Sequence, residues 1–393
     1  MAAASKTLSI LDKLRALTLK YGFITSSSAR EGFTLHHYGP CGAGLKHNLI
    51  NEWTKAVTLA ENISLIDVTS ASDDPEEIRK AALSYYPHLL RLNNDRLPVG
   101  LIYRTNERRD DDEISKTTGD DRFLIDSRFR ESYVLYQFVA PFTARRWIDY
   151  WERQRIQWWR RFARNPSNFT VSERSGNDSS DTAASAGLNN NNNNNNNGGG
   201  GKDIVKIRYD YPWGRDCIET IANYEREPLD EVGLNSTKFH GKAGRKTYLP
   251  SVLEIKFNVE HAILVNLCDA FAEKKLKRNL RTVLQLHRRL VHFKVAVAVT
   301  YSASSMTEVQ EVAGYVTRTL LGAGIVTLNL CNLSSQLTQN VTKCDHMGIP
   351  HVLIINEQCL TDGLVQLRNR DTTLEEQVHL TKIVEKLLKY NQA

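Results

Sequence analysis

The sequence predicts two domains: an α+β domain with an antiparallel sheet over residues 1–290, and an α/β domain with a mixed, mostly parallel sheet over residues 291–393. Two observations lead to this prediction. In the first part, strand-like segments separated by charged loops run into an aromatic helix, which is typical of an α+β domain. In the second part, apolar strands alternate with helices over short loops, which indicates a sheet with right-handed crossovers.

Composition allows a globular protein with a polyanionic partner. The chain has 393 residues, of which 41% are hydrophobic and 24% charged, and a net charge of +6. That length is ample for a buried core, and the mild positive charge permits nucleic acid as a partner. Six scattered cysteines lack C-x-x-C spacing, so neither a zinc site nor a disulfide framework is expected, and the compartment is expected to be reducing. No apolar run approaches the roughly 18 residues that span a membrane, so no membrane partner is expected.

The first 23 residues have two interpretations. They are amphipathic and basic, as in an organelle presequence. They also fit the first helix of the fold, with Ile10, Leu11, Leu14 and Leu17 on one face. Next, Gly39-Pro40-Cys41-Gly42 predicts a turn, which leads into a helix. A glycine-rich turn before a helix can hold phosphate, but this spacing matches no known phosphate-binding fingerprint, so a structural turn is predicted.

Strands are predicted at residues 63–68, 97–103, 123–125 and 133–139, with a helix over 74–90. They lead into the stretch ARRWIDYWERQRIQWWRRF, which predicts a helix from Ala144. Its aromatic residues form one stripe and its arginines lie opposite, so it is either a core helix with a solvated back or a helix whose back contacts nucleic acid. Arg155 falls inside the apolar stripe, so we expect it to meet a carboxylate.

An insertion and a basic segment follow. Residues 171–202 are Ser-, Asn- and Gly-rich, with nine consecutive Asn, and are expected to be disordered. Order is expected to resume at 203–207, and a strand at 249–255 and a helix at 259–271 precede a strongly cationic segment. Its cluster is Lys274, Lys275, Lys277, Arg278 and Arg281. This cluster is either a solvated connector or a contact with a nucleic-acid backbone, whose binding would weaken with salt.

The C-terminal part alternates strands and helices. Strands are predicted at 293–299, 325–330, 351–356 and 364–368, and helices at 308–321, 333–345 and 374–390. The run FKVAVAV is nearly all apolar, as expected of a strand buried on both faces. No known nucleophile, metal-binding or nucleotide-binding motif occurs, so no catalytic, metal or cofactor residues are predicted.

Several segments resemble one family. GPCGAGLKHNLINEW and LPVGLIY resemble signature regions of glycyl-type class II aminoacyl-tRNA synthetases, and GIPHVLIINEQ with GLVQLRNRDT resembles their anticodon-binding domain. WIDYWERQRIQWWRRFARNPSNF, YPWGRDCIETI, KFHGKAGRK and LRNRDTTLEEQVH are more similar to the accessory subunits of animal mitochondrial DNA polymerases, relatives of those synthetases. The resemblance covers most of the chain outside the Asn-rich insertion, and it implies a class II synthetase-like first domain and an anticodon-binding-like second domain.

Departures from the synthetase pattern favour the accessory subunits. The stretch RTNERRDDDE after LPVGLIY lacks a convincing equivalent of the Arg that holds ATP. In the third signature the Gly-rich turn is replaced by Phe257-Asn258-Val259-Glu260-His261, with His261 where the family has an Arg that grips the ATP phosphate. The resemblance therefore implies a non-catalytic protein without a cofactor.

What the resemblance implies is a processivity factor in the mitochondrial matrix and nucleoid. It would bind the catalytic subunit of the polymerase through its C-terminal domain and strengthen the grip on primer-template DNA. The basic cluster at 274–281 is the candidate for the DNA side. The surface around Leu364, Leu367, Arg368 and Arg370 is the candidate for the polymerase side, although Arg370 and Asp371 could instead form an internal ion pair.

The sequence also leads to an expected oligomeric state, and two alternative functions stay open. Vertebrate members of the family dimerise through a helical hairpin, and only about residues 73–94 occupy its place here, so a monomer that pairs one-to-one with the catalytic subunit is expected. One alternative is an active glycyl-like synthetase with diverged signatures. Another is a relative that binds tRNA or another RNA and has no polymerase partner.

Overall fold

The computed structural model describes residues 2–28, 34–59, 63–66, 74–108, 129–172, 203–276, 279–300, 305–331 and 336–392. The expected strand at 123–125 and nearly all of the expected disordered insertion at 171–202 lie outside these residues. So do Lys277 and Arg278 of the basic cluster.

The first domain is built on a seven-stranded sheet with strand order β3-β4-β5-β11-β8-β7-β6. All neighbours in it are antiparallel except β3 and β4, so the predicted antiparallel sheet is present. Its strands are β3 (Ile63–Leu65), β4 (Val99–Arg108), β5 (Phe129–Val139), β6 (Phe169–Val171), β7 (Ile204–Tyr211), β8 (Gly214–Asn223) and β11 (Ser251–Asn258).

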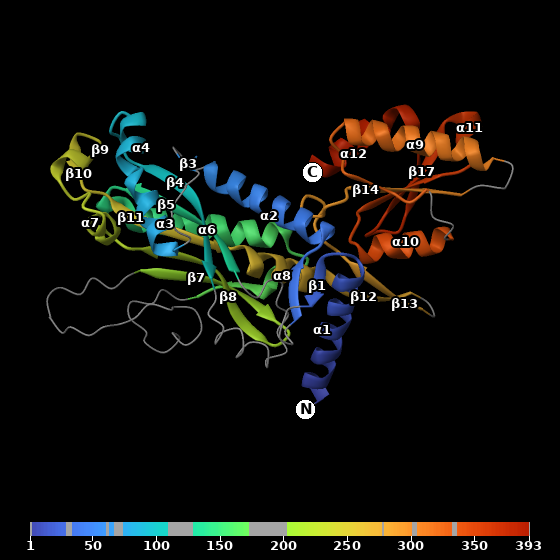
Figure 1. The fold of residues 1–393 in the computed structure, drawn as a ribbon, viewed down its shortest axis with the longest axis horizontal. Helices are drawn as coiled ribbons and strands as arrows, with labels where there is room; N and C mark the ends of the chain where they lie inside the picture. Colours follow the sequence, from blue (N-terminus) through green and yellow to red (C-terminus); the bar gives the residue numbers. More distant parts are fainter. Residues whose placement is uncertain are drawn as a thin grey trace.

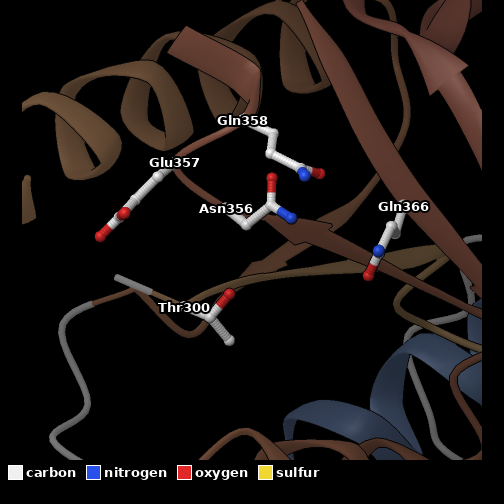
Figure 2. A pocket seen from close by; sticks show the side chains of 5 residues that line it. All are labelled: Thr300, Asn356, Glu357, Gln358 and Gln366. Carbon is white, nitrogen blue, oxygen red and sulfur yellow. The ribbon is translucent and has the colours of Figure 1, made fainter. Parts of the chain in front are cut away.

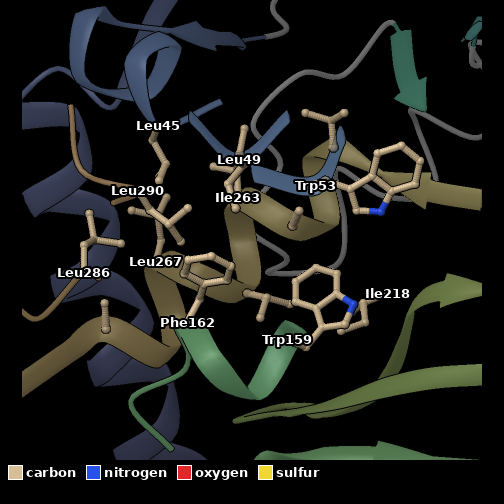
Figure 3. Packing of buried hydrophobic residues seen from close by; sticks show 14 of the residues in the cluster. Leu45, Leu49, Trp53, Trp159, Phe162, Ile218, Ile263, Leu267, Leu286 and Leu290 are labelled. Atoms are coloured by element: carbon tan, nitrogen blue, oxygen red, sulfur yellow. The ribbon is translucent and has the colours of Figure 1, made fainter. Parts of the chain in front are cut away.

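Helices cover both faces of this sheet because its strands alternate apolar side chains between the faces. Figure 3 shows one face, where Trp53 of α2 and Trp159 of α6 pack with Ile263 and Leu267 of α8. Apolar side chains of α3, α4 and α7 pack on the other face. The helices are α1 (Ala2–Lys20), α2 (Pro40–Thr58), α3 (Pro75–Ser84), α4 (Tyr86–Leu92), α6 (Ala144–Phe162), α7 (Glu227–Glu231) and α8 (Val259–Ala270).

In the described part of the first domain there are also three short antiparallel strand pairs outside the main sheet, and three single-turn helices. The pairs are β1 (Ile24–Ser28) with β2 (Thr34–Tyr38), β9 (Gly241–Ala243) with β10 (Lys246–Tyr248), and β12 (Phe271–Leu276) with β13 (Asn279–Leu284). The single-turn helices are η1 (Pro141–Thr143), η2 (Pro166–Asn168) and η3 (Thr237–Phe239). Helix α1 is part of the core from Leu11 onward, since Leu11, Leu14 and Leu17 are buried.

The second domain is a five-stranded sheet with order β15-β14-β16-β17-β18. Helices α9, α11 and α12 cover one face and α10 covers the other (Figure 1). Its strands are β14 (Val295–Val299), β15 (Thr327–Asn329), β16 (His351–Ile355), β17 (Leu364–Asn369) and β18 (Glu375–His379). Its helices are α9 (Met306–Gly322), α10 (Leu337–His346), α11 (Cys359–Asp362), the single turn η4 (Leu380–Lys382) and α12 (Ile383–Gln392).

Two predictions for this domain are wrong in part. The sheet is mixed but not mostly parallel, because β14 runs parallel to β15 and β16, whereas β16–β17 and β17–β18 are antiparallel. The helix predicted at 374–390 begins only at Ile383, since residues 375–379 form the edge strand β18. Pairing with β17 and burial of Val378 override the helix preference of Glu and Gln there.

The two domains share one core. Side chains on the α10 face of the second sheet, such as Val352 and Cys344, belong to the same buried cluster as the α2, α6 and α8 side chains of the first domain. Helix α1 and the turn after it contact both sides of the junction: Lys13 of α1 pairs with Glu273 of β12 at 2.9 Å, and the hydroxyl of Tyr21, which follows the helix, lies 2.9 Å from Nδ1 of His346. The second domain is therefore packed against the first rather than tethered to it.

Candidate functional site

The two groups of residues that the sequence predicts for DNA and polymerase contact meet at the junction between the domains. The basic segment forms the β12–β13 hairpin, in which Lys274 lies opposite Arg281. The predicted polymerase-facing residues lie on β17 and the turn that follows it. Main-chain and side-chain contacts join β13 to α10 and to this turn, so the two predicted surfaces are neighbours.

Arg281 does not point to solvent as a DNA contact requires. Its Nε donates to Oδ2 of Asp345 at 2.8 Å, and its Nη2 donates to the carbonyl of Arg370 at 2.9 Å. Asp345 is buried on α10 and also accepts two hydrogen bonds from Arg368, at 3.1 and 3.3 Å. One carboxylate therefore holds two guanidinium groups, one from each domain.

Arg370 makes a second set of contacts across the junction. Its Nη1 donates to the carbonyls of Gly348 (2.6 Å) and Leu284 (3.3 Å), and its Nε and Nη2 donate to Asp371 at 2.9 and 3.0 Å. The internal ion pair that the sequence left open is therefore present. Burial raises the pKa of Asp371, but the hydrogen bonds and charge of Arg370 outweigh it and hold that pKa below its ordinary value.

These contacts change the expected surface. Leu367, Arg368 and Arg370 are buried, so they are not the exposed contacts that the sequence predicts, and Leu364 is half-buried. An Arg in a charged motif resembles a surface contact in sequence, because nothing local shows that Asp345 or the Gly348 carbonyl will lie beside it. Of the basic cluster, Lys274 is half-buried, and the side chain of Lys275 lies outside the described residues.

A lysine stabilises the linker between the domains. Nζ of Lys294 donates to the carbonyls of Arg288, Arg289 and Val291 at 2.8 to 2.9 Å. Burial lowers the pKa of Lys294 to about 8. Three carbonyl acceptors fit an ammonium group, so the linker is held in one conformation.

The aromatic helix α6 meets the carboxylate that the sequence predicts. Arg155 is 1% exposed, and its Nε donates to Oε1 of Glu219 at 2.9 Å. The indole N–H groups of Trp53 and Trp159 donate to the same carboxylate at 2.8 and 2.6 Å. This arrangement supports the core interpretation for the aromatic stripe, since Trp151, Trp158 and Phe162 are buried too.

The segment with His261 begins helix α8. The Asn258 side chain caps this helix by accepting from the His261 amide at 2.9 Å, and the His261 ring nitrogen Nδ1 lies 2.9 Å from the Cys217 carbonyl. Glu260 beside it is buried. A carboxylate and a backbone-bound imidazole at this point do not provide a fixed cation for a triphosphate.

A polar pocket of about 580 Å³, which the sequence did not indicate, lies in the second domain at the ends of β14 and β16. Figure 2 shows its lining of Thr300, Asn356, Glu357, Gln358 and Gln366. The described lining holds amide groups, a hydroxyl group and the Glu357 carboxylate but no cation, so it suits neutral hydrogen-bonding groups better than phosphate. Among the described residues no group of His, Cys, Asp or Glu side chains could hold a metal ion, and no helix there is long and apolar enough to cross a membrane.

Comparison with known proteins identifies relatives of both domains. Residues 294–390 match the family model "Anticodon binding domain". The chain is 33% identical over 329 residues to DNA polymerase subunit gamma-2 of Bos taurus, covering 80% of this chain and 61% of the bovine protein. It is 28% identical to the mitochondrial DNA polymerase subunit gamma-2 of Xenopus laevis, covering 93% of this chain and 83% of the frog protein.

A second group of relatives is more distant. The glycine–tRNA ligase of Borreliella burgdorferi is 22% identical over 260 residues, covering 63% of this chain and 52% of the ligase. The resemblance expected from the sequence is confirmed: the chain is similar to the DNA polymerase subunit gamma-2 proteins and more distantly to glycine–tRNA ligases, and it has an anticodon-binding domain at its C-terminal end.

Proposed function

We propose that this chain is the non-catalytic accessory subunit of a mitochondrial DNA polymerase, located in the matrix and nucleoid. It would bind the catalytic subunit and stabilise it on primer-template DNA. The observation that carries the proposal is similarity to the gamma-2 subunits along 80% to 93% of the chain. The chain spans 61% of the length of the bovine relative.

The first domain, residues 1–290, is proposed to have a class II synthetase-like fold that has lost its nucleotide site. The largely antiparallel sheet and the similarity to glycine–tRNA ligases support this. His261 and the buried Glu260 support the loss of ATP binding, because neither supplies the lasting positive charge that a triphosphate requires. Residues 291–393 form the second domain in this proposal.

The polymerase-facing surface is proposed around the β17 strand. Half-buried Leu364 begins this strand, and Leu374, which is 72% exposed, follows its far end. Leu367, Arg368 and Arg370 would act by holding this surface in place, since their side chains are occupied inside the chain. A partner protein that covers the exposed Leu374 side chain would remove its apolar surface from water, which favours binding.

The DNA side is proposed at the β12–β13 hairpin, through Lys274, Lys275, Lys277 and Arg278. Arg281 would position this hairpin, because its guanidinium is bound to Asp345.

The chain is proposed to be a monomer that pairs one-to-one with the catalytic subunit. Residues 75–92 form the two short helices α3 and α4, whose apolar faces pack on the sheet of the same chain. A solution mass measurement should give about 45 kDa, the mass of one chain. A stable mass of twice that value would contradict the proposal.

One experiment separates the proposed function from its alternatives. A tagged chain expressed in its own cells should co-purify the mitochondrial polymerase catalytic subunit and should show no amino-acid-dependent pyrophosphate exchange. Robust exchange with glycine would establish an active synthetase instead. Recovery of tRNA or another RNA without the polymerase would establish an RNA-binding relative.

A further inference from the structure

A second cationic surface lies at the end of the first domain remote from the second domain. We call it the distal basic surface, and in Figure 1 it lies around β9, β10 and α4. It consists of eight exposed cations and one exposed ring: Arg91, Arg96, Arg145, Arg146, Lys238, Lys242, Arg245, Lys246 and Phe142. Part of this surface is the KFHGKAGRK motif at residues 238–246, whose cations belong neither to the core nor to the proposed DNA and polymerase surfaces at the junction.

Short-range contacts connect these residues into one surface. Arg91 and Lys238 line one hollow together with Asp95. Asp95 pairs with Lys242 at 3.4 Å, and Lys242 forms a β-bridge with Arg96. At the other side of the hairpin the Tyr248 ring lies edge-on to the Phe142 ring, with centroids 5.3 Å apart, and Arg145 and Arg146 begin helix α6 just beyond.

The positive charge of this surface is largely uncompensated. Asp95 is the carboxylate that pairs with one of its members, and the part of the chain that the structure describes provides no ion pair for the other seven cations. The acids of nearby α7 have partners of their own, since Asp230 pairs with Arg226, Glu231 pairs with Arg79, and Glu227 also has a partner. Like charges gathered on one surface repel one another, and a polyanion that neutralises them relieves that repulsion.

The exposed ring indicates which polyanion fits. Phe142 is 68% exposed, although water contact is unfavourable for a phenyl ring. Cations around an accessible aromatic ring are the arrangement that binds single strands, because phosphates meet the cations and an unpaired base stacks on the ring. A duplex keeps its base faces stacked internally and offers no partner to Phe142.

We propose that the distal basic surface binds single-stranded DNA, with the phosphates along the β9–β10 cations and a base on Phe142. The ligand rests on the proposed function, since a subunit of a DNA polymerase works beside single-stranded template. The surface lies far from the junction, so one chain could hold the polymerase at one end and unpaired template at the other.

The test measures binding of a fluorescent single-stranded DNA oligonucleotide to the whole chain, without polymerase, at several salt concentrations. Lys242→Ala/Arg245→Ala/Lys246→Ala should flatten the salt dependence, by about 0.7 in the slope of log K against log salt for each phosphate that is no longer neutralised. Phe142→Ala should weaken binding about tenfold and leave this slope unchanged, because stacking releases no counterions.

Matched controls lie in the second domain. Arg318→Ala/Lys382→Ala/Lys389→Ala also removes three exposed cations, and Tyr315→Ala removes a ring that is 62% exposed. Neither should alter binding by more than about twofold. Equal losses in the controls, an unaffected Phe142→Ala, an equal loss of duplex DNA binding in Phe142→Ala, or tighter binding of RNA of the same length would each overturn the inference.

Capture of the catalytic subunit by the same variants separates this inference from the proposed function. If the β9–β10 variant Lys242→Ala/Arg245→Ala/Lys246→Ala no longer captured the catalytic subunit, the inference would be overturned, because the surface would then be a protein contact. If the unaltered chain captures no polymerase yet the oligonucleotide results are as expected, the proposed function fails and the single-strand site stands.

Discussion

Glu219 is the buried carboxylate that accepts hydrogen bonds from several side chains in the core of the first domain. It lies on β8 and accepts hydrogen bonds from Arg155 and from two indole groups, on α2 and α6. The Arg155 guanidinium also lies 4.5 Å from the Trp158 ring centre. Burial lowers the pKa of Arg155, and the Glu219 charge opposes that effect. A single carboxylate therefore joins two helices to the sheet and keeps a buried cation paired.

Glu219→Gln should lower the free energy of unfolding by about 3–5 kcal/mol, because Arg155 would remain buried without its counter-ion. Urea unfolding measures this. Arg226→Ala, which breaks an exposed pair with Asp230 at 3.4 Å, should change the same quantity by less than about 1 kcal/mol. Similar results for the two variants would refute the role assigned to Glu219.

His351 makes stability depend on pH. It is 3% exposed, and burial lowers its pKa from 6.5 to about 4, assisted by Arg370 and Arg288 and opposed by Asp371 and Glu376. The unfolded chain gains the proton near pH 6.5, whereas the folded chain resists it until about pH 4. The contribution of His351 is therefore complete above pH 6.5 and is lost as the pH falls toward 4.

His351→Leu should remove that component of the pH dependence. The unaltered chain should lose up to about 1.4 kcal/mol per pH unit inside this window from His351, and the variant should lose correspondingly less. Unfolding curves at intervals from pH 7 to pH 4 measure the difference. His37→Leu, at an exposed position, serves as the control. An identical pH dependence for His351→Leu and the unaltered chain would contradict the assignment.

At the scale of elements, the β12–β13 hairpin and helix α10 determine how the domains are joined. Arg281 from β13 and Arg368 from β17 share the carboxylate of Asp345 on α10, and Arg370 reaches the Leu284 carbonyl on β13. This arrangement makes the junction a charged but internally satisfied contact. It places the proposed DNA hairpin directly beside the proposed polymerase-facing turn.

Asp345→Asn should loosen this junction, because an amide cannot satisfy two guanidinium groups. We expect a loss of about 3 kcal/mol and a separate, earlier melting transition for one domain in calorimetry. Glu385→Gln, on the exposed side of α12, should leave a single transition. A single unshifted transition in Asp345→Asn would show that the shared apolar core alone joins the domains.

The salt dependence of duplex DNA binding tests the role of the cations on the β12–β13 hairpin. Lys275→Ala/Lys277→Ala/Arg278→Ala should reduce the slope of log K against log salt for duplex DNA by about 0.9 for each phosphate that is left without its cation. Arg318→Ala/Lys382→Ala/Lys389→Ala provides the matched loss of three exposed cations, on α9, η4 and α12. An unchanged slope in the hairpin variant would remove this hairpin from the DNA surface.

Sequence patterns predicted the elements better than their contacts. Strands β4, β5, β11 and β14 and helices α2, α6 and α9 lie where periodicity places them, because each buries a continuous apolar face. Arg155 was predictable since a charge inside an apolar stripe requires a counter-ion. The partners of Arg281 and Arg370 come from other elements, and β18 depends on an edge pairing, so local sequence could not indicate either.

At the scale of the whole molecule, the two sheets form one elongated body with a shared core. The proposed polymerase-facing turn and DNA hairpin lie at the junction, and the distal basic surface lies at the opposite end of the first domain. This arrangement suits a protein that lengthens the contact between a polymerase and its template without performing chemistry itself.

The central claim is best tested by the length of the DNA made in one binding event. The catalytic subunit should extend a primer on a single-stranded circle in the presence of excess competitor DNA, with and without this chain. We predict clearly longer products with the chain present, and none from the chain alone. Products of unchanged length, with both proteins shown to be folded and mixed one-to-one, would contradict the account.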